Sequence, residues 1–340
     1  MKHIAYVALA FILSASGLAG QERTTTKTGT TAAQFLKIGV HARVMGMGEA
    51  SVAHVSDISS VQWNPAGLSR HNVQEAVFTN TTWLAETDLL HFAGSLSFGA
   101  AGVLAFQITS LDYGDMPVTT EREENGTGEF FTAQDLSIGV AYARNLTNTF
   151  SLGAQFKLIS QRIWNMNAST MAVDMGALFL TPLQGVRLGM SISNFGGKMK
   201  LAGRDTRFYS DPEPLLEGNN DQIPANFELS SWAIPLTFRV GLAGELIQTN
   251  VLRLSWAMDA LHPSDNSEYV DVGTELALAE RLFLRGGMRT LFAADQVGGL
   301  SLGVGLHQPF TPTFKIKVDY AWVDYAELLP VSMLSVTIQY

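Results

Sequence analysis

The sequence contains few groups of residues that could carry out catalysis. His262, Ser264 and Asp265 lie close together in the segment HPSDNS, and a hydrolase triad uses these residue types. A proline followed by small polar residues is more typical of a turn between strands, so we interpret this segment as a surface turn. We therefore expect a protein without enzymatic activity.

Metal and nucleotide sites have equally little support. The seven histidines (residues 3, 41, 54, 71, 91, 262 and 307) include no His-x-x-x-His pair, and the chain has no cysteine to bind zinc. The Gly-x-Gly in VMGMGEA does not follow a predicted strand in a βαβ unit, as a dinucleotide-binding motif requires. We interpret it as flexible backbone and expect neither a metal ion nor a cofactor.

A row of arginines is a more informative pattern. Arg281, Arg285 and Arg289 in RLFLRGGMR lie on the same face of an extended strand, because side chains alternate with a period of two. Such a row could attract an anionic ligand. It could also pair with acids on the neighbouring strand, namely Asp271 and Glu275, and we favour this structural role.

Alternation also predicts the strands that position these charges. In RLGMSISNF (187–195) every second residue is apolar, and in FKIKVDYAW (314–322) apolar residues alternate with Lys and Asp. This pattern is typical of strands with one apolar and one polar face. A soluble sandwich would bury the apolar faces, whereas a transmembrane barrel turns them to lipid around a polar lumen.

The number of strands and the lengths of their connections favour the barrel. About fourteen strands are predicted, near residues 73–83, 89–98, 101–112, 130–143, 149–162, 169–180, 185–196, 233–246, 251–261, 269–278, 281–290, 299–307, 314–324 and 331–340. Every second connection is a short turn, whereas 113–129 and 197–232 are long and polar. Outer-membrane barrels have this pattern, with the short turns in the periplasm. We expect an all-β, fourteen-stranded antiparallel transmembrane β-barrel over residues 73–340.

The N-terminus and the composition indicate export to the outer membrane. Lys2 and His3 precede the apolar run IAYVALAFIL and then small residues, which predicts a signal peptide over residues 1–20. Charged residues make up 16% of the chain, fewer than the roughly 25% of soluble domains. The formal net charge of −9 argues against nucleic acid as a partner.

Aromatic residues are placed as a bilayer would require. Trp83, Tyr113, Trp164, Trp232, Tyr269, Phe292 and Tyr325 lie near the ends of predicted strands on the long-loop side. Aromatic belts at these positions contact lipid headgroups, so outer-membrane lipid is an expected partner. The C-terminal LSVTIQY is an alternating strand that ends in an aromatic residue, and it resembles the signal read by barrel-assembly machinery.

Residues 21–72 precede the first predicted strand and do not alternate. They contain a Thr-rich linker and then the motif Trp63, Asn64, Pro65, Ala66 and Gly67. An extended residue before proline, the fixed φ of proline and the freedom of glycine predict a rigid corner. We predict a linker and a luminal hatch that turns into the wall here, with the tryptophan as an apolar anchor. A simple turn before the first strand is the alternative.

These motifs resemble a known family. The segment FLKIGVHARVMGMGEASVAHVSDISSVQWNPAGL (35–68) is similar to the N-terminal signature of the PorV/PorQ outer-membrane proteins, and through them to the FadL fatty-acid transporters. The likeness continues in FGGKMKLAG, WAIPLTFRVGLA, DALHPSDNSEYVDVGTEL and FLRGGMRTL. The resemblance implies a fourteen-stranded, FadL-like barrel that takes part in type IX secretion. The dedicated secretion members carry a somewhat different hatch sequence, which leaves the exact role open.

Two functions follow from this resemblance. The first is an accessory or docking protein in secretion or surface attachment, with a protein partner at its extracellular loops. The alternative is a transporter of small hydrophobic molecules such as fatty acids. A strand interrupted by Gly or Pro beside the hatch would favour transport, because a lateral opening needs broken hydrogen bonds in the wall. Both functions are compatible with the sequence.

Overall fold

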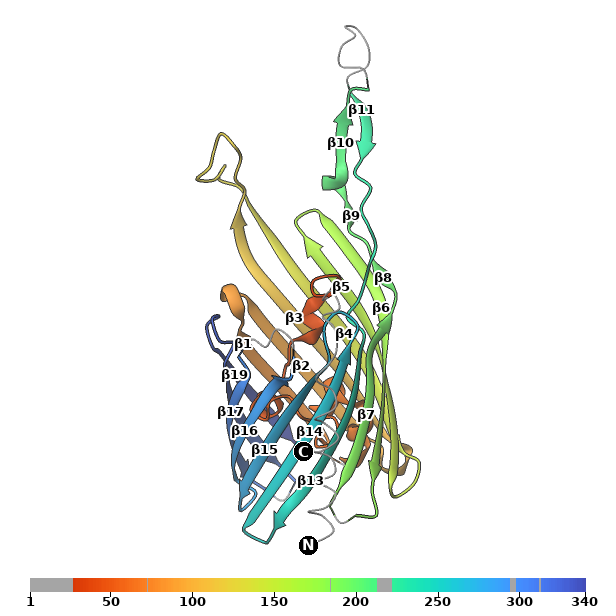
Figure 1. Ribbon diagram of the computed structural model, residues 1–340, viewed down its shortest axis with the longest axis vertical. Helices are drawn as coiled ribbons and strands as arrows, with labels where there is room; N and C mark the ends of the chain where they lie inside the picture. The colour runs from red at the N-terminus through yellow and green to blue at the C-terminus, as the bar shows by residue number, and fades with distance from the viewer. Residues whose placement is uncertain (1–26, 72, 184, 213–221, 294–297, 312) are drawn as a thin grey trace.

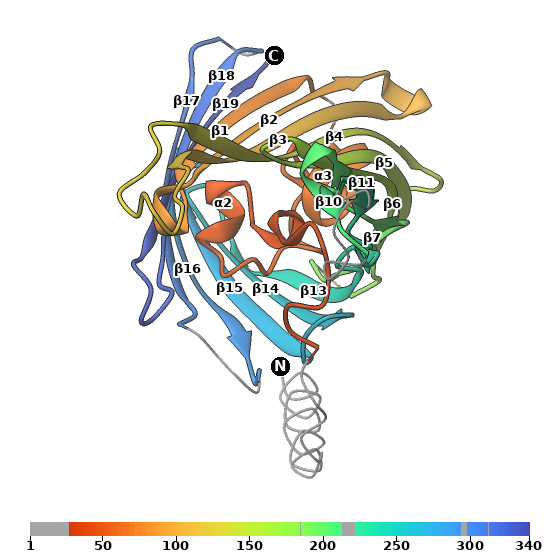
Figure 2. The same ribbon diagram turned by 90° about the horizontal axis from the view of Figure 1, so that it is seen from above.

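A computed structural model describes residues 27–340 apart from residues 72, 184, 213–221, 294–297 and 312. The expected signal peptide, residues 1–20, lies outside the described residues. Within the described chain, fourteen long antiparallel strands form a closed barrel around an N-terminal segment with short helices (Figures 1 and 2). The predicted fold class is confirmed.

The wall strands pair in chain order. They are β1 Glu75–Thr82, β2 Asp88–Ser97, β3 Val103–Pro117, β4 Phe130–Asn145, β5 Phe150–Ile163, β6 Met166–Leu180, β7 Arg187–Gly196, β13 Thr237–Gln248, β14 Leu252–Pro263, β15 Tyr269–Leu278, β16 Leu282–Leu291, β17 Leu300–Pro309, β18 Lys315–Val323 and β19 Val331–Gln339. Pairing of β1 with β19, in which Thr79 lies opposite Ser335, closes the cylinder. Closure satisfies the backbone of the first and last strands, which would otherwise be open edges.

Exposure alternates along each strand in the sense that a membrane barrel requires. On β17, Leu302 and Leu306 are exposed on the outer face, whereas Ser301 and His307 are buried on the inner face. A soluble sandwich would show the reverse arrangement. The apolar outer face and polar interior are those of a barrel surrounded by lipid.

The N-terminal segment lies inside the barrel (Figure 2). We call residues 33–71 the hatch. Its helical elements are η1 Gln34–Lys37, α2 Ala42–Met45, α3 Ser60–Trp63 and η2 Pro65–Arg70. The first three are short because glycine or proline follows each of them within a few residues. No helix among the described residues has the length and apolar character needed to cross a bilayer.

The long connections extend from one end of the barrel, here called the long-loop end (Figure 1). The β3 strand reaches farther than predicted, because a register shift between Asp112 and Asp115 interrupts the alternation without ending the pairing with β4. The predicted loop 197–232 contains β8 Lys198–Met199, β9 Ala202–Gly203, β10 Arg207–Ser210, β11 Ile223–Asn226 and β12 Trp232–Ala233. The pair β10 and β11 projects beyond the barrel. Three further short helices are η3 Leu84–Glu86, η4 Gly99–Ala101 and η5 Arg204–Thr206.

Candidate functional site: the hatch and its contacts with the wall

Glycines in the wall allow the hatch to approach closely. Gly153, Gly176 and Gly189 lie on β5, β6 and β7 and face the hatch. A Cβ atom at Gly153 would overlap the backbone of Pro65, and one at Gly176 would overlap the side chain of Asn64. The predicted corner of the hatch therefore rests directly on the wall backbone.

A second set of wall glycines receives the Gly-x-Gly segment. Gly273, Gly287 and Gly303 on β15, β16 and β17 lie against the backbone of residues 46–48, where added Cβ atoms would collide. Gly48 has a φ of 64°, a left-handed conformation that favours glycine. The Gly-x-Gly thus serves close packing between hatch and wall.

Asn64 links the hatch corner to the wall through its amide. Its Nδ2 donates to the carbonyl oxygen of Val52 at 2.7 Å and to that of Ala177 on β6 at 3.0 Å. Its Oδ1 accepts from the backbone N–H of Ala66 at 3.2 Å. Because Asn64 is fully buried, these bonds cannot be replaced by water.

The other motif residues also pack tightly. Trp63 is 1% exposed and belongs to an apolar cluster that joins hatch residues such as Phe35 to Ile159 on the wall. Pro65 and Ala66 are buried at the start of η2. Gly67 does not adopt the left-handed conformation that a reversal would use; a Cβ there would instead collide with the Val55 carbonyl oxygen.

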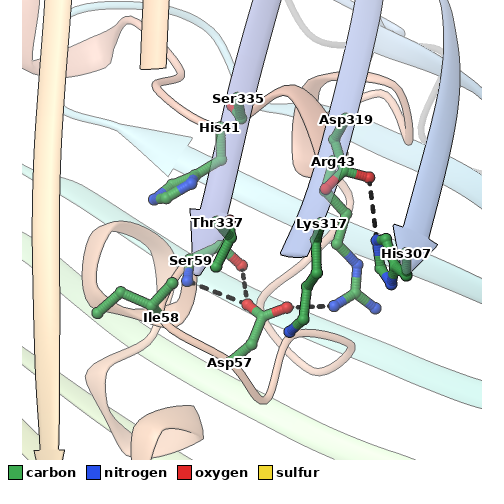
Figure 3. A pocket seen from close by; sticks show the side chains of 10 residues that line it. All are labelled: His41, Arg43, Asp57, Ile58, Ser59, His307, Lys317, Asp319, Ser335 and Thr337. Atoms are coloured by element: carbon green, nitrogen blue, oxygen red, sulfur yellow. Dashed lines mark hydrogen bonds and ion pairs between the residues drawn. The ribbon is translucent and has the colours of Figure 1, made fainter. Parts of the chain in front are cut away.

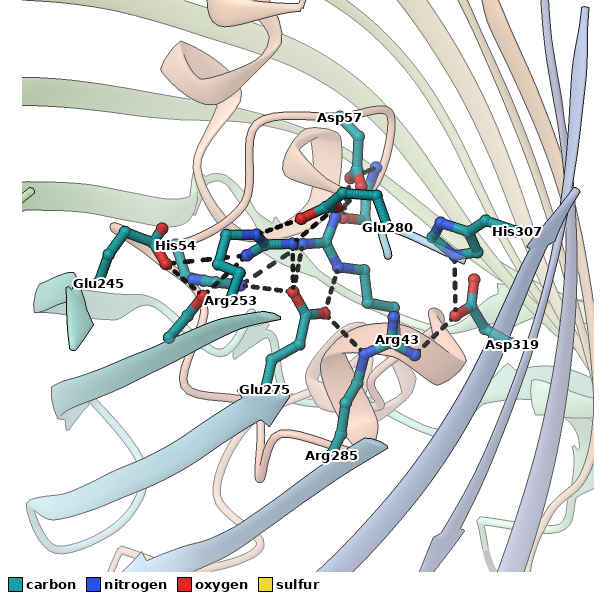
Figure 4. A network of polar contacts seen from close by, with 12 residues as sticks. Arg43, His54, Asp57, Glu245, Arg253, Glu275, Glu280, Arg285, His307 and Asp319 are labelled. Atoms are coloured by element: carbon teal, nitrogen blue, oxygen red, sulfur yellow. Dashed lines mark hydrogen bonds and ion pairs between the residues drawn. The ribbon is translucent and has the colours of Figure 1, made fainter. Parts of the chain in front are cut away.

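Charged side chains join the hatch to strands β14–β18 (Figure 4). Arg43 of α2 pairs with Asp57 of the hatch and with Glu275 on β15, whose Oε2 lies 3.3 Å from Nε. Glu275 also pairs with Arg285 at 2.8 Å and with Arg253 at 3.3 Å. Three arginines thus converge on one buried carboxylate.

The predicted row of arginines occupies three different environments. Arg285 pairs with Glu275 and donates to Asp319 at 2.6 Å. Arg289 pairs with Glu49 of the hatch at 2.8 Å. Arg281 lies exposed in the turn before β16, outside this network, because β16 begins at Leu282.

The second predicted acid has a backbone partner. Asp271 is buried on β15, and its carboxylate accepts from the backbone N–H of Thr290 at 2.8 Å. The structure therefore brings Glu275 and Arg285 together, whereas Asp271 binds the backbone of the neighbouring strand β16 near the long-loop end.

Several residues of this site were not predicted. Asp259 on β14 accepts from the backbone N–H groups of Ser51 at 2.6 Å and Val52 at 2.8 Å. Asp259 and Asp319 occupy polar positions of alternating strands, so the period of two could have identified them. Arg43 and Asp57 lie in the segment without alternation, where no comparable signal exists.

The HPSDNS turn contacts the start of the hatch. Asp265 accepts from Thr31 Oγ1 and Gln34 Nε2, both at 2.8 Å, and pairs with Lys37 at 3.1 Å. Burial alone would raise the pKa of Asp265, but the donors of Gln34, Thr31 and Lys37 hold it below its ordinary value. His262 bonds to Glu268 instead, so this turn is not a triad.

A small cavity separates the hatch from β17, β18 and β19 (Figure 3). Its volume is about 20 Å³, and its lining includes Arg43 and Asp57 of the hatch and Lys317 and Asp319 of the wall. A space of this size holds about one water molecule. It is therefore a gap within the charged network and too small for an organic ligand.

The pairing of β6 with β7 is interrupted beside the hatch. It runs from Leu180 opposite Arg187 to Ala172 opposite Gly196, with a register shift between Val173 and Met175. The β7 strand then ends, and the first residues of β6 pair with the short strand β9. We call this interruption, where β6 before Ala172 no longer pairs with β7, the seam of the wall.

Buried polar side chains seal the seam. Lys157 on β5 pairs with Asp174 on β6 at 2.7 Å, and Asp174 accepts from the backbone N–H of Asn194 at 2.6 Å. Asn194, with a φ of 63°, donates to the carbonyl oxygen of Pro235 at 3.0 Å. Side-chain hydrogen bonds thus replace the missing ladder bonds.

Comparison with known proteins agrees with this fold. Residues 21–230 match the family model described as type IX secretion system protein PorV. No curated protein matches the sequence at a significant level.

Solved structures of low sequence identity share the architecture. A FadL homologue of Pseudomonas aeruginosa aligns with a TM-score of 0.53 at 11% identity, covering 88% of this chain and 98% of that one. The toluene transporter TodX of Pseudomonas putida aligns with a TM-score of 0.55 at 13% identity, covering 89% of this chain and 98% of that one. The toluene transporter TbuX of Ralstonia pickettii aligns with a TM-score of 0.52 at 12% identity, covering 89% of this chain and 97% of that one. At such identities the likeness concerns the fold alone.

Proposed function

Because the chain belongs to the PorV family of type IX secretion system proteins, we propose that it is a docking component of that system, with a protein partner at its extracellular loops. The observation that supports this role is the asymmetry of the two ends. Long hairpins project from one end of the barrel, whereas short turns close the other (Figure 1). Long loops on a rigid scaffold usually carry function.

The β10–β11 hairpin has the surface properties of a binding element. Phe208 stacks on Phe227 with ring centroids 4.5 Å apart, and Phe227 is 60% exposed. Tyr209 on the same hairpin is 72% exposed. Large aromatic side chains contribute most of the binding energy in many protein interfaces, so their exposure here supports a protein partner.

Replacement of these aromatics tests the docking role. Tyr209→Ala with Phe227→Ala should reduce copurification of secretion-system partners from detergent-solubilised outer membrane. The matched control is Phe310→Ala, since Phe310 is 62% exposed in a turn at the opposite end. Both variants should remain folded, as judged by heat-modifiable migration in gels. Unchanged partner recovery and secretion with the hairpin variant would argue against docking through this element.

We also propose that the predicted site residues act in structure rather than in catalysis. PorV proteins are secretion components and not an enzyme family. Asn64 and Glu275 join the hatch to the wall, and Arg285 joins Glu275 to Asp319 within the wall. This arrangement supports a hatch that seals the lumen while the outer loops bind the partner.

The seam between β6 and β7 favours a second candidate function, the transport of small hydrophobic molecules. The strand β7 ends at Gly196 and Gly197 follows, so the wall is interrupted by glycine beside the hatch. Uptake of a labelled long-chain fatty acid by cells expressing the chain tests this candidate. Transport predicts uptake that depends on the chain and is retained by the hairpin variant; no chain-dependent uptake would exclude it.

A further inference from the structure

We propose that the outer face of β4, β5 and β6 binds an acyl chain of an outer-leaflet lipid, whose phosphate group lies toward Arg162. A groove of about 350 Å³ lies on these strands, a volume in the range of small-molecule sites. Its lining includes Leu136, Ile138, Leu158, Ser160, Ser169 and Met171. The groove lies on the outer face of the wall and shares Ile159 with the apolar cluster that contacts the hatch on the inner face. It does not depend on the partner of the loops.

The strand register arranges the groove in layers. Ile138, Leu158 and Met171 lie side by side across the three strands and form an apolar row. These side chains are 42%, 46% and 60% exposed on the outer face, continuous with the lipid-facing surface of the barrel. The bilayer that surrounds this outer face consists of acyl chains, so an acyl chain is the expected occupant of the groove.

The next row toward the long-loop end is more polar. Leu136, Ser160 and Ser169 are paired across the same strands. The two serines are small residues among large apolar neighbours, and their size explains the hollow. Their hydroxyl groups can donate to ester oxygens at the level where a lipid changes from chain to headgroup.

The third row is wholly polar and carries a cation. Gln134, Arg162 and Asn167 lie opposite one another in the register, and all three are exposed. A guanidinium group recognises a phosphate through charge-assisted hydrogen bonds. The three rows, which are apolar, hydroxyl-bearing and cationic in this order toward the long-loop end, therefore match the acyl chain, ester and phosphate of a phospholipid.

The seam explains why the groove occurs on this part of the wall. Beyond Ala172 the β6 strand no longer pairs with β7, and the chain after β7 passes close to β6 at Gly197, whose N–H donates to the carbonyl oxygen of Met171 at 3.2 Å. Met171 therefore stands at the margin of the regular sheet, where side chains of a further strand do not cover it.

Lipid retention by the full-length protein tests the proposal. The protein is purified in maltoside detergent, supplied with palmitoyl-oleoyl phosphatidylglycerol or phosphatidylcholine, and measured by native mass spectrometry. Wild type should retain lipid, and Ser169→Trp, which fills the groove, should lose it. Arg162→Gln should keep the chain site but lose any preference for phosphatidylglycerol.

The control variant is Ser332→Trp, which introduces the same side chain on the outer face of β19, away from the groove. It should retain lipid like wild type, and heat-modifiable migration should show that every variant is folded. Equal lipid retention by Ser169→Trp and wild type would overturn the proposal. Retention of detergent alone would overturn it as well, since the groove would then have no affinity for a lipid.

Discussion

Glu275 is the residue on which the charged contacts between hatch and wall converge. Its carboxylate is fully buried and faces Arg43, Arg253 and Arg285. A buried charge group of this kind tolerates loss of one member poorly, because the remaining charges cannot be solvated.

Replacement of Glu275 should therefore loosen the hatch. Glu275→Gln removes the carboxylate that Arg43, Arg253 and Arg285 share and leaves each arginine with only its other acidic partners. Breaking a buried ion pair typically costs about 3–5 kcal/mol. We expect a lower thermal stability and new conductance in planar bilayers. Glu280→Gln is the matched control, because Glu280 binds the same Arg253 but is 61% exposed in its side chain. Equal effects of both variants would contradict a specific role for Glu275.

Asp265 should make the docking of the N-terminal segment dependent on pH. Its pKa in the folded chain is held below the ordinary value by its donors. Because this pKa is lower than the unfolded value of about 3.9, the ionised carboxylate stabilises the folded protein at pH values above about 3.9. This stabilisation is lost as the pH falls through the pKa of the folded state.

Hydrogen exchange of residues 31–37 measures this effect. Protection should be constant at neutral pH and fall at acidic pH below about 4. Asp265→Asn should show weaker protection at neutral pH and little further change on acidification. A wild-type profile that does not change with pH would show that Asp265 does not hold this segment.

At the scale of elements, glycines in the wall strands allow the hatch to pack closely against the wall. The β6 strand approaches the hatch corner so closely that a Cβ at Gly176 would overlap Asn64. Strand pairing itself does not require glycine at this position, since any residue can adopt extended backbone.

Gly176→Ala should thus displace the hatch while the barrel still forms. We expect a folded, heat-modifiable barrel with increased conductance. Gly286→Ala is the control, because the nearest atom to a Cβ there is a Leu302 methyl group at 4.0 Å. Silent bilayer recordings from both variants would mean that the hatch can shift without opening the lumen.

At the scale of the whole molecule, the orientation of side chains defines the membrane-facing surface. Val304 lies near the middle of β17 on the outer face and is 48% exposed. An arginine at the midplane of a barrel's lipid face costs roughly 2–4 kcal/mol.

Val304→Arg should accordingly reduce the fraction of folded protein in lipid vesicles. Leu329→Arg, in the loop between β18 and β19 where Leu329 is 82% exposed, should fold like wild type. The folded fractions are measured by heat-modifiable migration over a denaturant series. If the two variants fold equally well, the outer face of β17 does not contact lipid.

The wall could be predicted from sequence because its signal is local. A period of two, as in residues 187–195, reports which faces are apolar, and adjacent strands follow one another through short turns. The prediction of β1 near 73–83 agrees with Glu75–Thr82. The pairing of Glu275 with Arg285 was accessible in the same way, because neighbouring strands place their alternating side chains opposite one another.

The hatch contacts could not be predicted in this way, because they join residues that are distant in sequence. Arg43 and Glu275 are separated by 232 positions, and no period relates a segment without alternation to a particular strand. The packing roles of Gly176 and Gly67 depend on which atoms lie above them in the folded chain. Sequence alone therefore determined the barrel, its alternating faces and a separate N-terminal segment, whereas the tertiary structure decided how that segment is held, since close packing and charge pairing depend on three-dimensional proximity.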